Sequence, residues 1–307
     1  MTTVPPTKTA AIGLLTETVV LEKCDYLLDV QLWPTKGILN PERWLENFNP
    51  TEREFALYLL NAFQFYSEDL TNHLFIAAID GIGRHVTSQE KSMKVRAGRW
   101  DTFLTQALFT YVEGETPNPA DSGYAFARRA RQLIGIPEAN IVTPDNAIRE
   151  VLSSPGRPVV FVDDFVGSGD QFCGTWFRQR ELSQNRKTAF SDVQKAVEAK
   201  FYYAPLVCTA DGAYNIRTSC TGLELLPVHV LTQRDSLLHP QCPYWPPHLA
   251  PHAHSFIQDV SARAGISDWK GYSDLGLSIA FHHSTPDACL PLYYWNKNGW
   301  RPLVNRA

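Results

Sequence analysis

The spacing of hydrophobic residues changes along the chain and divides it into regions. In the first hundred residues apolar side chains recur every three or four positions, for example at Phe55, Leu59, Leu60 and Phe63. This period matches one face of an α-helix. It predicts helices over residues 51–66 and 67–81, and we expect residues 1–104 to form a mainly helical segment.

From residue 105 short apolar runs alternate with amphipathic stretches. Residues 158–162 are continuously apolar, as expected for a strand buried on both faces of a sheet. The remaining expected strands are 107–112, 139–143, 201–209 and 225–231, and the expected helices are 122–134, 144–152 and 169–182. Pro227 weakens the last strand, because proline is confined to strand edges and ends. The alternation predicts an α/β fold with a parallel sheet, in which ligands bind at the carboxyl ends of the strands.

The candidate chemistry lies directly after the apolar run. Two acids, Asp163 and Asp164, lead into a loop and helix start formed by Val166, Gly167, Ser168, Gly169, Asp170 and Gln171. Glycines allow a tight turn that brings backbone N–H groups close to an anion, and a helix N-terminus adds positive partial charge. Carboxylates can accept hydrogen bonds from sugar hydroxyls. The segment therefore predicts a phosphate site beside a ribose site.

Each part of this segment also has a purely structural interpretation. Adjacent acids at a strand end are commonly just solvated, and a Gly-Ser-Gly loop is often only a turn. Their combination after four apolar residues is a more specific pattern than either part alone.

Composition and charge narrow the function classes. The formal net charge of the 307 residues is −4, which gives no support to nucleic-acid or membrane-surface binding. No apolar run approaches the roughly 18–20 residues that span a bilayer, and residues 1–11 lack an apolar signal-peptide core. We expect a cytoplasmic protein with no membrane association. The six cysteines include no C-x-x-C pair, and the late histidines with Cys242 match no standard zinc spacing.

Residues 159–171 resemble the signature of type I phosphoribosyltransferases: four apolar residues, two acids, two spacers, a small or hydroxyl residue, Ser or Thr, then Gly. Members of that family bind phosphoribosyl pyrophosphate, usually with Mg²⁺. The resemblance implies that Asp163 and Asp164 are the catalytic and Mg²⁺-binding carboxylates and hold the ribose 2- and 3-hydroxyls. It implies that residues 166–171 wrap the 5-phosphate. The implied organisation is the N-terminal helical segment 1–104, a phosphoribosyltransferase-like core 105–235 and a C-terminal hood 236–307.

The pyrophosphate end of such a ligand is expected at the loop of residues 114–123. Ser122 and Gly123 lie at a helix start and can offer backbone donors to an anion. Candidates to reach the anion from this helix are Arg128, Arg129 and Arg131. His282 and His283 are candidates for a wall that faces the substrate.

Further segments are similar to the phosphoribosyltransferase-like proteins of bacterial conflict, or anti-phage, systems. They are residues 44–48, 122–131, 281–286 and 290–292, and the likeness extends from about residue 31 onward. It implies an effector or component of a defence system. The N-terminal helical segment is then a candidate contact for a protein partner, through Trp33, Trp44 and nearby apolar residues.

Three departures from the family pattern leave the activity open. Gly167 stands where many purine-using members carry an Asp, and Asp170 places an acid beside the expected phosphate. Little chain separates the strand near Val142 from Val159, so the long mobile loop of many active members has little room. The alternatives are a phosphoribosyltransferase, a non-catalytic nucleotide- or partner-binding module, and a toxin that cleaves the glycosidic bond of a nucleotide.

Overall fold

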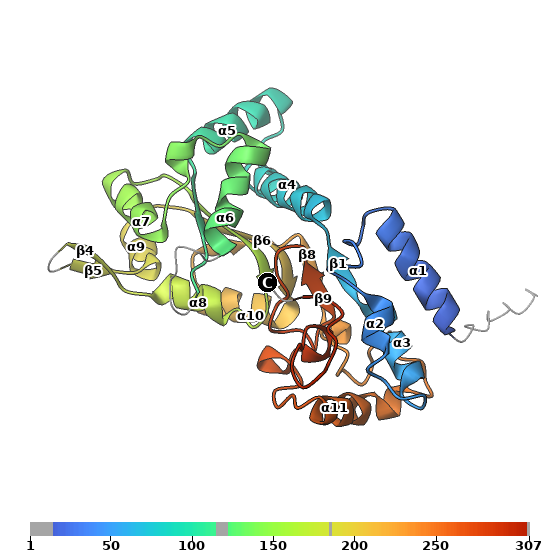
Figure 1. Ribbon diagram of the computed structural model, residues 1–307. Coiled ribbons are helices and arrows are strands. Elements are labelled where there is room, and N and C mark those ends of the chain that lie inside the picture. The colour runs from blue at the N-terminus through green and yellow to red at the C-terminus, as the bar shows by residue number, and fades with distance from the viewer. Residues whose placement is uncertain (1–14, 115–121, 184–185, 306–307) are drawn as a thin grey trace, which may run out of the picture.

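A parallel sheet lies at the centre of the computed structural model and carries helices on both faces (Figure 1). The structure describes residues 15–114, 122–183 and 186–305. The helices are α1 (Glu17–Asp29), α2 (Pro41–Leu45), α3 (Arg53–Ala62), α4 (Glu68–Val86), α5 (Met93–Gln106), α6 (Ser122–Arg129), α7 (Pro144–Ser153), α8 (Asp170–Phe177), α9 (Phe190–Ala196), α10 (Ala210–Ser219) and α11 (Ala253–Arg263). The strands are β1 (Gln64–Tyr66), β2 (Leu108–Tyr111), β3 (Val159–Val166), β4 (Arg180–Ser183), β5 (Arg186–Thr188), β6 (Phe201–Thr209), β7 (Leu223–Leu225), β8 (His229–Leu231) and β9 (Ile279–Phe281).

The central sheet has five strands in the order β2-β3-β6-β7, and β8 pairs with the far end of β6. Every pair is parallel, and Val159 of β3 aligns with Leu108 on one side and Phe201 on the other. The whole of β6 is buried, as its unbroken apolar sequence requires. The predicted α/β fold with a parallel sheet is confirmed, and the carboxyl ends of β2, β3 and β6 meet at one edge.

Alternate side chains of β3 enter two different cores, because successive residues of a strand point to opposite faces. Val160 and Val162 pack in the core that includes residues of α4 and α6. Val159 and Phe161 pack in the core that includes residues of α7, α8, α9 and α10. Because side chains alternate in this way, the next two residues, Asp163 and Asp164, point to opposite faces of the strand.

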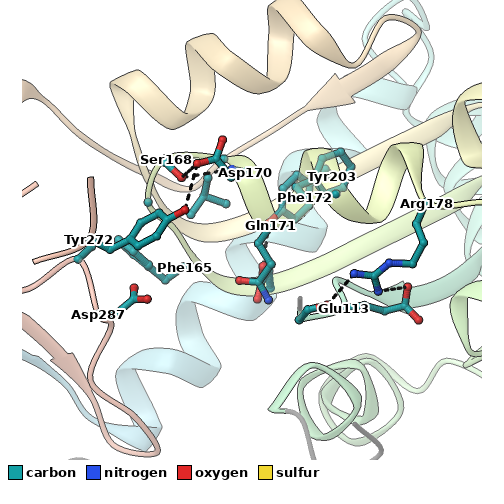
Figure 2. A pocket seen from close by; sticks show the side chains of 17 residues that line it. Glu113, Phe165, Ser168, Asp170, Gln171, Phe172, Arg178, Tyr203, Tyr272 and Asp287 are labelled. Atoms are coloured by element: carbon teal, nitrogen blue, oxygen red, sulfur yellow. Dashed lines mark hydrogen bonds and ion pairs between the residues drawn. The ribbon is translucent and has the colours of Figure 1, made fainter. Parts of the chain in front are cut away.

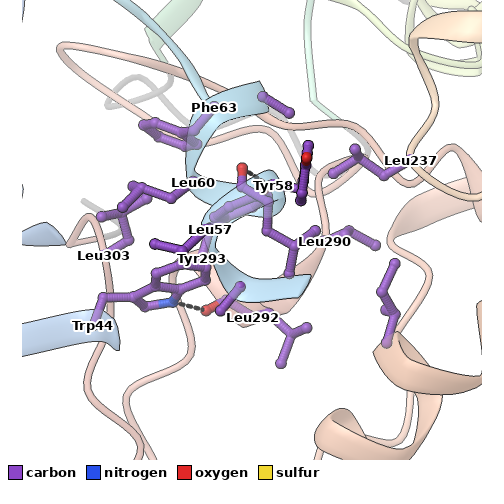
Figure 3. Close-up of a cluster of buried hydrophobic side chains, with 14 of the residues drawn as sticks. Trp44, Leu57, Tyr58, Leu60, Phe63, Leu237, Leu290, Leu292, Tyr293 and Leu303 are labelled. Carbon is purple, nitrogen blue, oxygen red and sulfur yellow. Dashed lines mark hydrogen bonds between the residues drawn. The ribbon is translucent and has the colours of Figure 1, made fainter. Parts of the chain in front are cut away.

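A third core joins the two ends of the chain (Figure 3). The buried indole of Trp44 donates its Nε1–H to the carbonyl oxygen of Leu292 at 2.8 Å, and Tyr293 donates its hydroxyl to Leu59 O at 2.9 Å. Strand β1 also pairs in parallel with β9, more than two hundred residues later. The helices before residue 64 and the segment after residue 236 therefore pack as one unit. The domain boundaries that the sequence suggests near residues 104 and 235 remain a prediction.

The core position of two tryptophans corrects one expectation. Trp33 is 5% exposed and Trp44 is fully buried, so neither side chain offers a surface to a protein partner. Both belong to the core shared by the chain ends. No helix in the described ranges is long and apolar enough to cross a bilayer.

Several predicted elements have different limits in the structure. The helix expected over 51–66 ends at Ala62, because residues 64–66 pair with β9 instead. The strand expected over 158–162 continues to Val166, so both acids lie within it. The helix expected over 169–182 ends at Phe177 and a hairpin of β4 and β5 follows.

Two expected strands are also changed. Residues 225–231 form the ends of two short strands, β7 and β8, with Pro227 between them. Residues 139–143 contribute a single bridge, from Ile141 to Phe109, after a short 3₁₀ turn. The helix predicted over 122–134 is present, and its last turn, Ala130–Ile134, is π-helical.

Candidate functional site

A cavity of about 320 Å³ lies at the carboxyl end of β3 (Figure 2). All six residues predicted for the phosphate loop, residues 166–171, line it, and so does Asp163. Other elements complete the wall with Glu113 and Gly114 after β2, Arg178 after α8, Tyr203 of β6, and Tyr272 and Asp287 of the C-terminal segment. The structure therefore brings the predicted loop to a solvent-accessible hollow.

The loop is fixed by close packing on the start of α10. Gly169 has φ of 86°, and a Cβ there would lie 2.9 Å from the carbonyl oxygen of Gly212, so only glycine fits. A Cβ on Gly212 would in turn lie 2.1 Å from Gly167 O. Thr209 donates its hydroxyl to Gly167 O at 2.6 Å. The glycines thus serve close backbone packing between two βα junctions.

Asp170, the acid that departs from the family pattern, acts as an anion inside the loop. Its carboxylate accepts hydrogen bonds from the hydroxyl of Ser168 at 2.6 Å and the amide of Asn215 at 3.1 Å. Tyr272 donates to the same carboxylate at 3.4 Å, as Figure 2 shows. As the first residue of α8, Asp170 also interacts favourably with the positive end of the helix. Ser168 is therefore already engaged by a carboxylate.

Asp163 lies on the aromatic face of β3 and is 9% exposed. Its Oδ2 accepts the hydroxyl of Tyr203 at 2.8 Å, and its Oδ1 accepts the backbone N–H of Asp164 at 3.0 Å. The Tyr203 ring stacks on Phe172 at 4.1 Å between centroids. Burial, and then the charge of Asp164, raise the pKa of Asp163 well above its ordinary value. Burial and Asp163 likewise raise the pKa of Tyr203.

Asp164 has different partners on the other face of the strand. Its Oδ2 lies 2.5 Å from Nε2 of His283, and the two side chains keep exposures of 15% and 22%. His282 lies next in line, with its Nδ1 3.4 Å from Nδ1 of His283. Burial, then His283 and Arg129, lower the pKa of His282 to about 4. Asp164 itself is not among the residues that line the cavity.

These surroundings bear on the expected Mg²⁺ site. Both oxygens of Asp163 accept hydrogen bonds from protein donors, and Oδ2 of Asp164 is engaged by His283. No three His, Cys, Asp or Glu side chains gather as a metal-binding set in the described part of the chain. Asp163 and Asp164 do not by themselves fit a metal centre in this arrangement.

The expected pyrophosphate side falls largely on residues 115–121, which lie outside the described residues. Ser122 begins α6, and Gly123 is buried with its Cα so close to β2 that a Cβ would lie 2.8 Å from Val112 O. Gly123 is not among the described residues that line the cavity. Arg129 contacts His282 and Arg131 pairs with Glu138, so these arginines are directed elsewhere.

Arg178 is the one basic side chain among the described residues that line the cavity. It pairs with Glu113 at 3.2 Å and donates to Gly114 O at 2.8 Å, at the opposite end from Asp170 (Figure 2). Sequence reasoning missed Arg178, Glu113, Tyr203 and Tyr272. Only Tyr203 had a signal, since it lies on a predicted strand of the parallel sheet.

A five-stranded parallel sheet, with a glycine loop and helix start at a cavity beyond its central strand, defines a phosphoribosyltransferase-like α/β protein. The model of the PRTase-CE family matches residues 41–306. This is most of the chain, and the chain belongs to that phosphoribosyltransferase-like family. No curated protein matches it.

Proposed function

We propose that the protein binds phosphoribosyl pyrophosphate, or a related ribose 5-phosphate nucleotide, in the cavity beyond β3. The observation that supports this most is that residues 166–171 line one hollow together with Asp163. Backbone N–H groups at the start of α8 have no acceptor within the helix and suit a phosphate. The 5-phosphate would lie at Ser168 and Gly169, with the ribose toward Asp163 and Asp164.

The charge of the cavity shapes this proposal. Among the residues that the structure describes, four carboxyl groups, those of Glu113, Asp163, Asp170 and Asp287, line it against the single guanidinium of Arg178. A ligand with several phosphate charges would be repelled unless cations accompany it. We therefore propose that Mg²⁺ enters with the ligand, held mainly by the ligand's phosphate oxygens.

As an enzyme, the protein would transfer ribose 5-phosphate from phosphoribosyl pyrophosphate to a nucleophile. The bond between the anomeric carbon and the pyrophosphate oxygen breaks, and its electron pair leaves with pyrophosphate. The nucleophile forms the new bond to that carbon and loses a proton. With water as the nucleophile and a nucleotide as the substrate, the same site would cleave a glycosidic bond.

A non-catalytic nucleotide- or partner-binding module is the second candidate. Asp170 favours this candidate, because its carboxylate already accepts the hydrogen bond that the Ser168 hydroxyl would donate to a phosphate. In either case we propose a cytoplasmic effector or component of a bacterial anti-phage system. A protein partner at the N-terminal helical segment would use α1, which leaves Val19, Tyr26 and Val30 exposed along one side.

Calorimetry with phosphoribosyl pyrophosphate and Mg²⁺ tests the binding proposal. The wild type should bind, and Gly169→Ala should abolish detectable binding because its backbone conformation and its contact with Gly212 exclude a Cβ. Gly98→Ala, in α5 away from the cavity and with open space around the added methyl, is the matched control and should bind normally. No heat from the wild type would refute the proposal. Release of pyrophosphate on incubation would separate the enzyme from the binding module.

A further inference from the structure

A continuous line of polar side chains reaches Asp164 from the helices on the same face of the sheet. Arg129 of α6 lies with Nη2 3.2 Å from Nε2 of His282, and His282 Nδ1 lies 3.4 Å from His283 Nδ1. His283 Nε2 then lies 2.5 Å from Asp164 Oδ2. The line therefore connects α6, the turn after β9 and the carboxyl end of β3.

The hydrogen-bond partners of these groups indicate an arrangement of protons. A guanidinium can only donate, so His282 must accept from Arg129 at Nε2 and carry its proton on Nδ1. Two atoms lie near that Nδ1–H, His283 Nδ1 at 3.4 Å and Thr71 Oγ1 at 3.5 Å, and the nearer one, His283 Nδ1, is the acceptor in this arrangement. His283 is left with its proton on Nε2, directed at Asp164. Burial supports the same assignment, because it keeps His282 neutral.

We infer that His283 is a positioning residue that holds the Asp164 side chain in a single orientation at the carboxyl end of β3, with the His283 proton fixed on Nε2 by His282 and Arg129. An N–H donor stabilises the carboxylate form of an acid and fixes its rotamer. With Oδ2 engaged, Oδ1 is the oxygen that would turn to a ligand hydroxyl. His283 would not touch the ligand.

The position of Asp164 in the strand supports this role. Asp164 lies near the carboxyl end of β3, the edge at which parallel sheets bind ligands, and its side chain is partly exposed on the face opposite to Asp163. Asp163 has both oxygens engaged and a raised pKa, so it is a weaker acceptor for a sugar hydroxyl. The inference rests on the proposed function for its ligand but not for its proton arrangement.

Two measurements test the inference. In the first, ¹⁵N-histidine NMR of the whole protein reports which nitrogen of each ring carries the proton. We expect His282 with Nδ1–H and His283 with Nε2–H at neutral pH. A His283 ring protonated on Nδ1, or on both nitrogens, would overturn the inference whether or not any ligand binds.

In the second, calorimetry compares ribose 5-phosphate with inorganic phosphate. His283→Leu should weaken ribose 5-phosphate by about tenfold or more and leave inorganic phosphate unchanged, because only the sugar end depends on Asp164. His283→Gln, whose amide can place a donor near Nε2, should restore the affinity to within about threefold. His248→Leu breaks a second histidine–carboxylate pair, with Glu54, which is exposed at the surface and does not line the cavity, and it is the control.

The outcomes separate the two proposals. If the wild type binds neither ligand, the proposed function fails and the NMR result alone decides on His283. If the wild type binds ribose 5-phosphate and His283→Leu binds it equally well, the proposed function stands and the positioning role is refuted. If Leu and Gln variants weaken binding of both ligands equally, His283 has a general structural role and the inference is also refuted.

Discussion

Asp163 and Asp164 are consecutive residues of β3, yet they lie in opposite kinds of surroundings. Asp163 lies against aromatic rings, with Tyr203 and a backbone amide as its donors, and burial favours its neutral form. Asp164 lies at the end of a line of histidines and is partly exposed. Two identical side chains thus acquire different hydrogen-bond partners and different exposure from the two faces of one strand. Two adjacent acids that resemble a single diol-binding pair in the sequence can therefore have two different roles in the structure.

Truncation of Phe172 should destabilise the aromatic packing on the face of β3 where Asp163 lies. Phe172 is 1% exposed and packs on Tyr203 and Phe161, so Phe172→Ala should lower the free energy of unfolding by about 3–5 kcal/mol. Denaturant unfolding measures this. Phe177→Ala, on the same helix but 47% exposed, should change it by about 0.5 kcal/mol or less. Similar losses in both variants would show that the face is not tightly packed around Asp163.

The two acids can be compared directly in binding. Asp164→Asn removes a carboxyl acceptor and should weaken ribose 5-phosphate by about 1.5–3 kcal/mol in calorimetry. Asp163→Asn changes a carboxyl whose two oxygens already accept hydrogen bonds from the protein and whose pKa is raised by burial, and it should weaken binding by less. The resemblance to phosphoribosyltransferases implied equal roles for both acids, and equal losses would restore that interpretation.

The contributions of Asp163 and His282 to the free energy of unfolding, on the two faces of β3, should change with pH in opposite directions. The raised pKa of Asp163 contributes stability below the pKa of the unfolded chain, about 3.9, and this contribution is lost as pH rises through the folded value. One proton gives a slope of at most about 1.4 kcal/mol per pH unit. The lowered pKa of His282 contributes stability that is present above about pH 6.5 and lost as pH falls toward about 4.

Unfolding by denaturant between pH 4 and 7 checks these signs. Asp163→Asn should abolish the loss of stability on rising pH, and His282→Gln should reduce the loss on falling pH. The reverse assignment, or wild-type slopes in both variants, would contradict the difference between the faces.

The smallest effect is expected where a contact is marginal. Thr71 Oγ1 lies 3.5 Å from His282 Nδ1, at the limit of a hydrogen bond. Thr71→Val should change ribose 5-phosphate affinity by about 0.5 kcal/mol or less and leave the proton on His282 Nδ1. A changed tautomer in the NMR spectrum would show that α4, and not the histidine pair, orients Asp164.

The local pattern of apolar residues and glycines was sufficient to predict the parallel sheet and the phosphate loop. The apolar runs around Val159 and Phe201 predicted two strands of a parallel sheet, and the glycine spacing predicted the loop that lines the cavity. These features depend on residues close in sequence, where hydrophobic period and turn chemistry act directly.

The rest of the site depends on contacts between distant residues. Tyr203 approaches Asp163 from 40 residues away, and His283 approaches Asp164 from 119. The prediction that the helix continues to residue 66 was wrong for the same reason, because residues 64–66 form β1 by pairing with the distant strand β9. A single sequence contains no local signal for such pairings, because tertiary contacts override intrinsic propensity.

The core that joins the chain ends has a consequence for the order in which the protein is made. A ribosome delivers Trp44 and Leu59 long before Leu292 and Tyr293, the residues that cover them. Until then the emerging chain exposes an apolar surface that nothing of its own can shield, and such surfaces attract chaperones or aggregate. The completed chain must also close a contact between residues 64 and 279, which slows folding through the entropy of a long loop. A protein truncated shortly before residue 279 would therefore lose the packing at its beginning as well as its end.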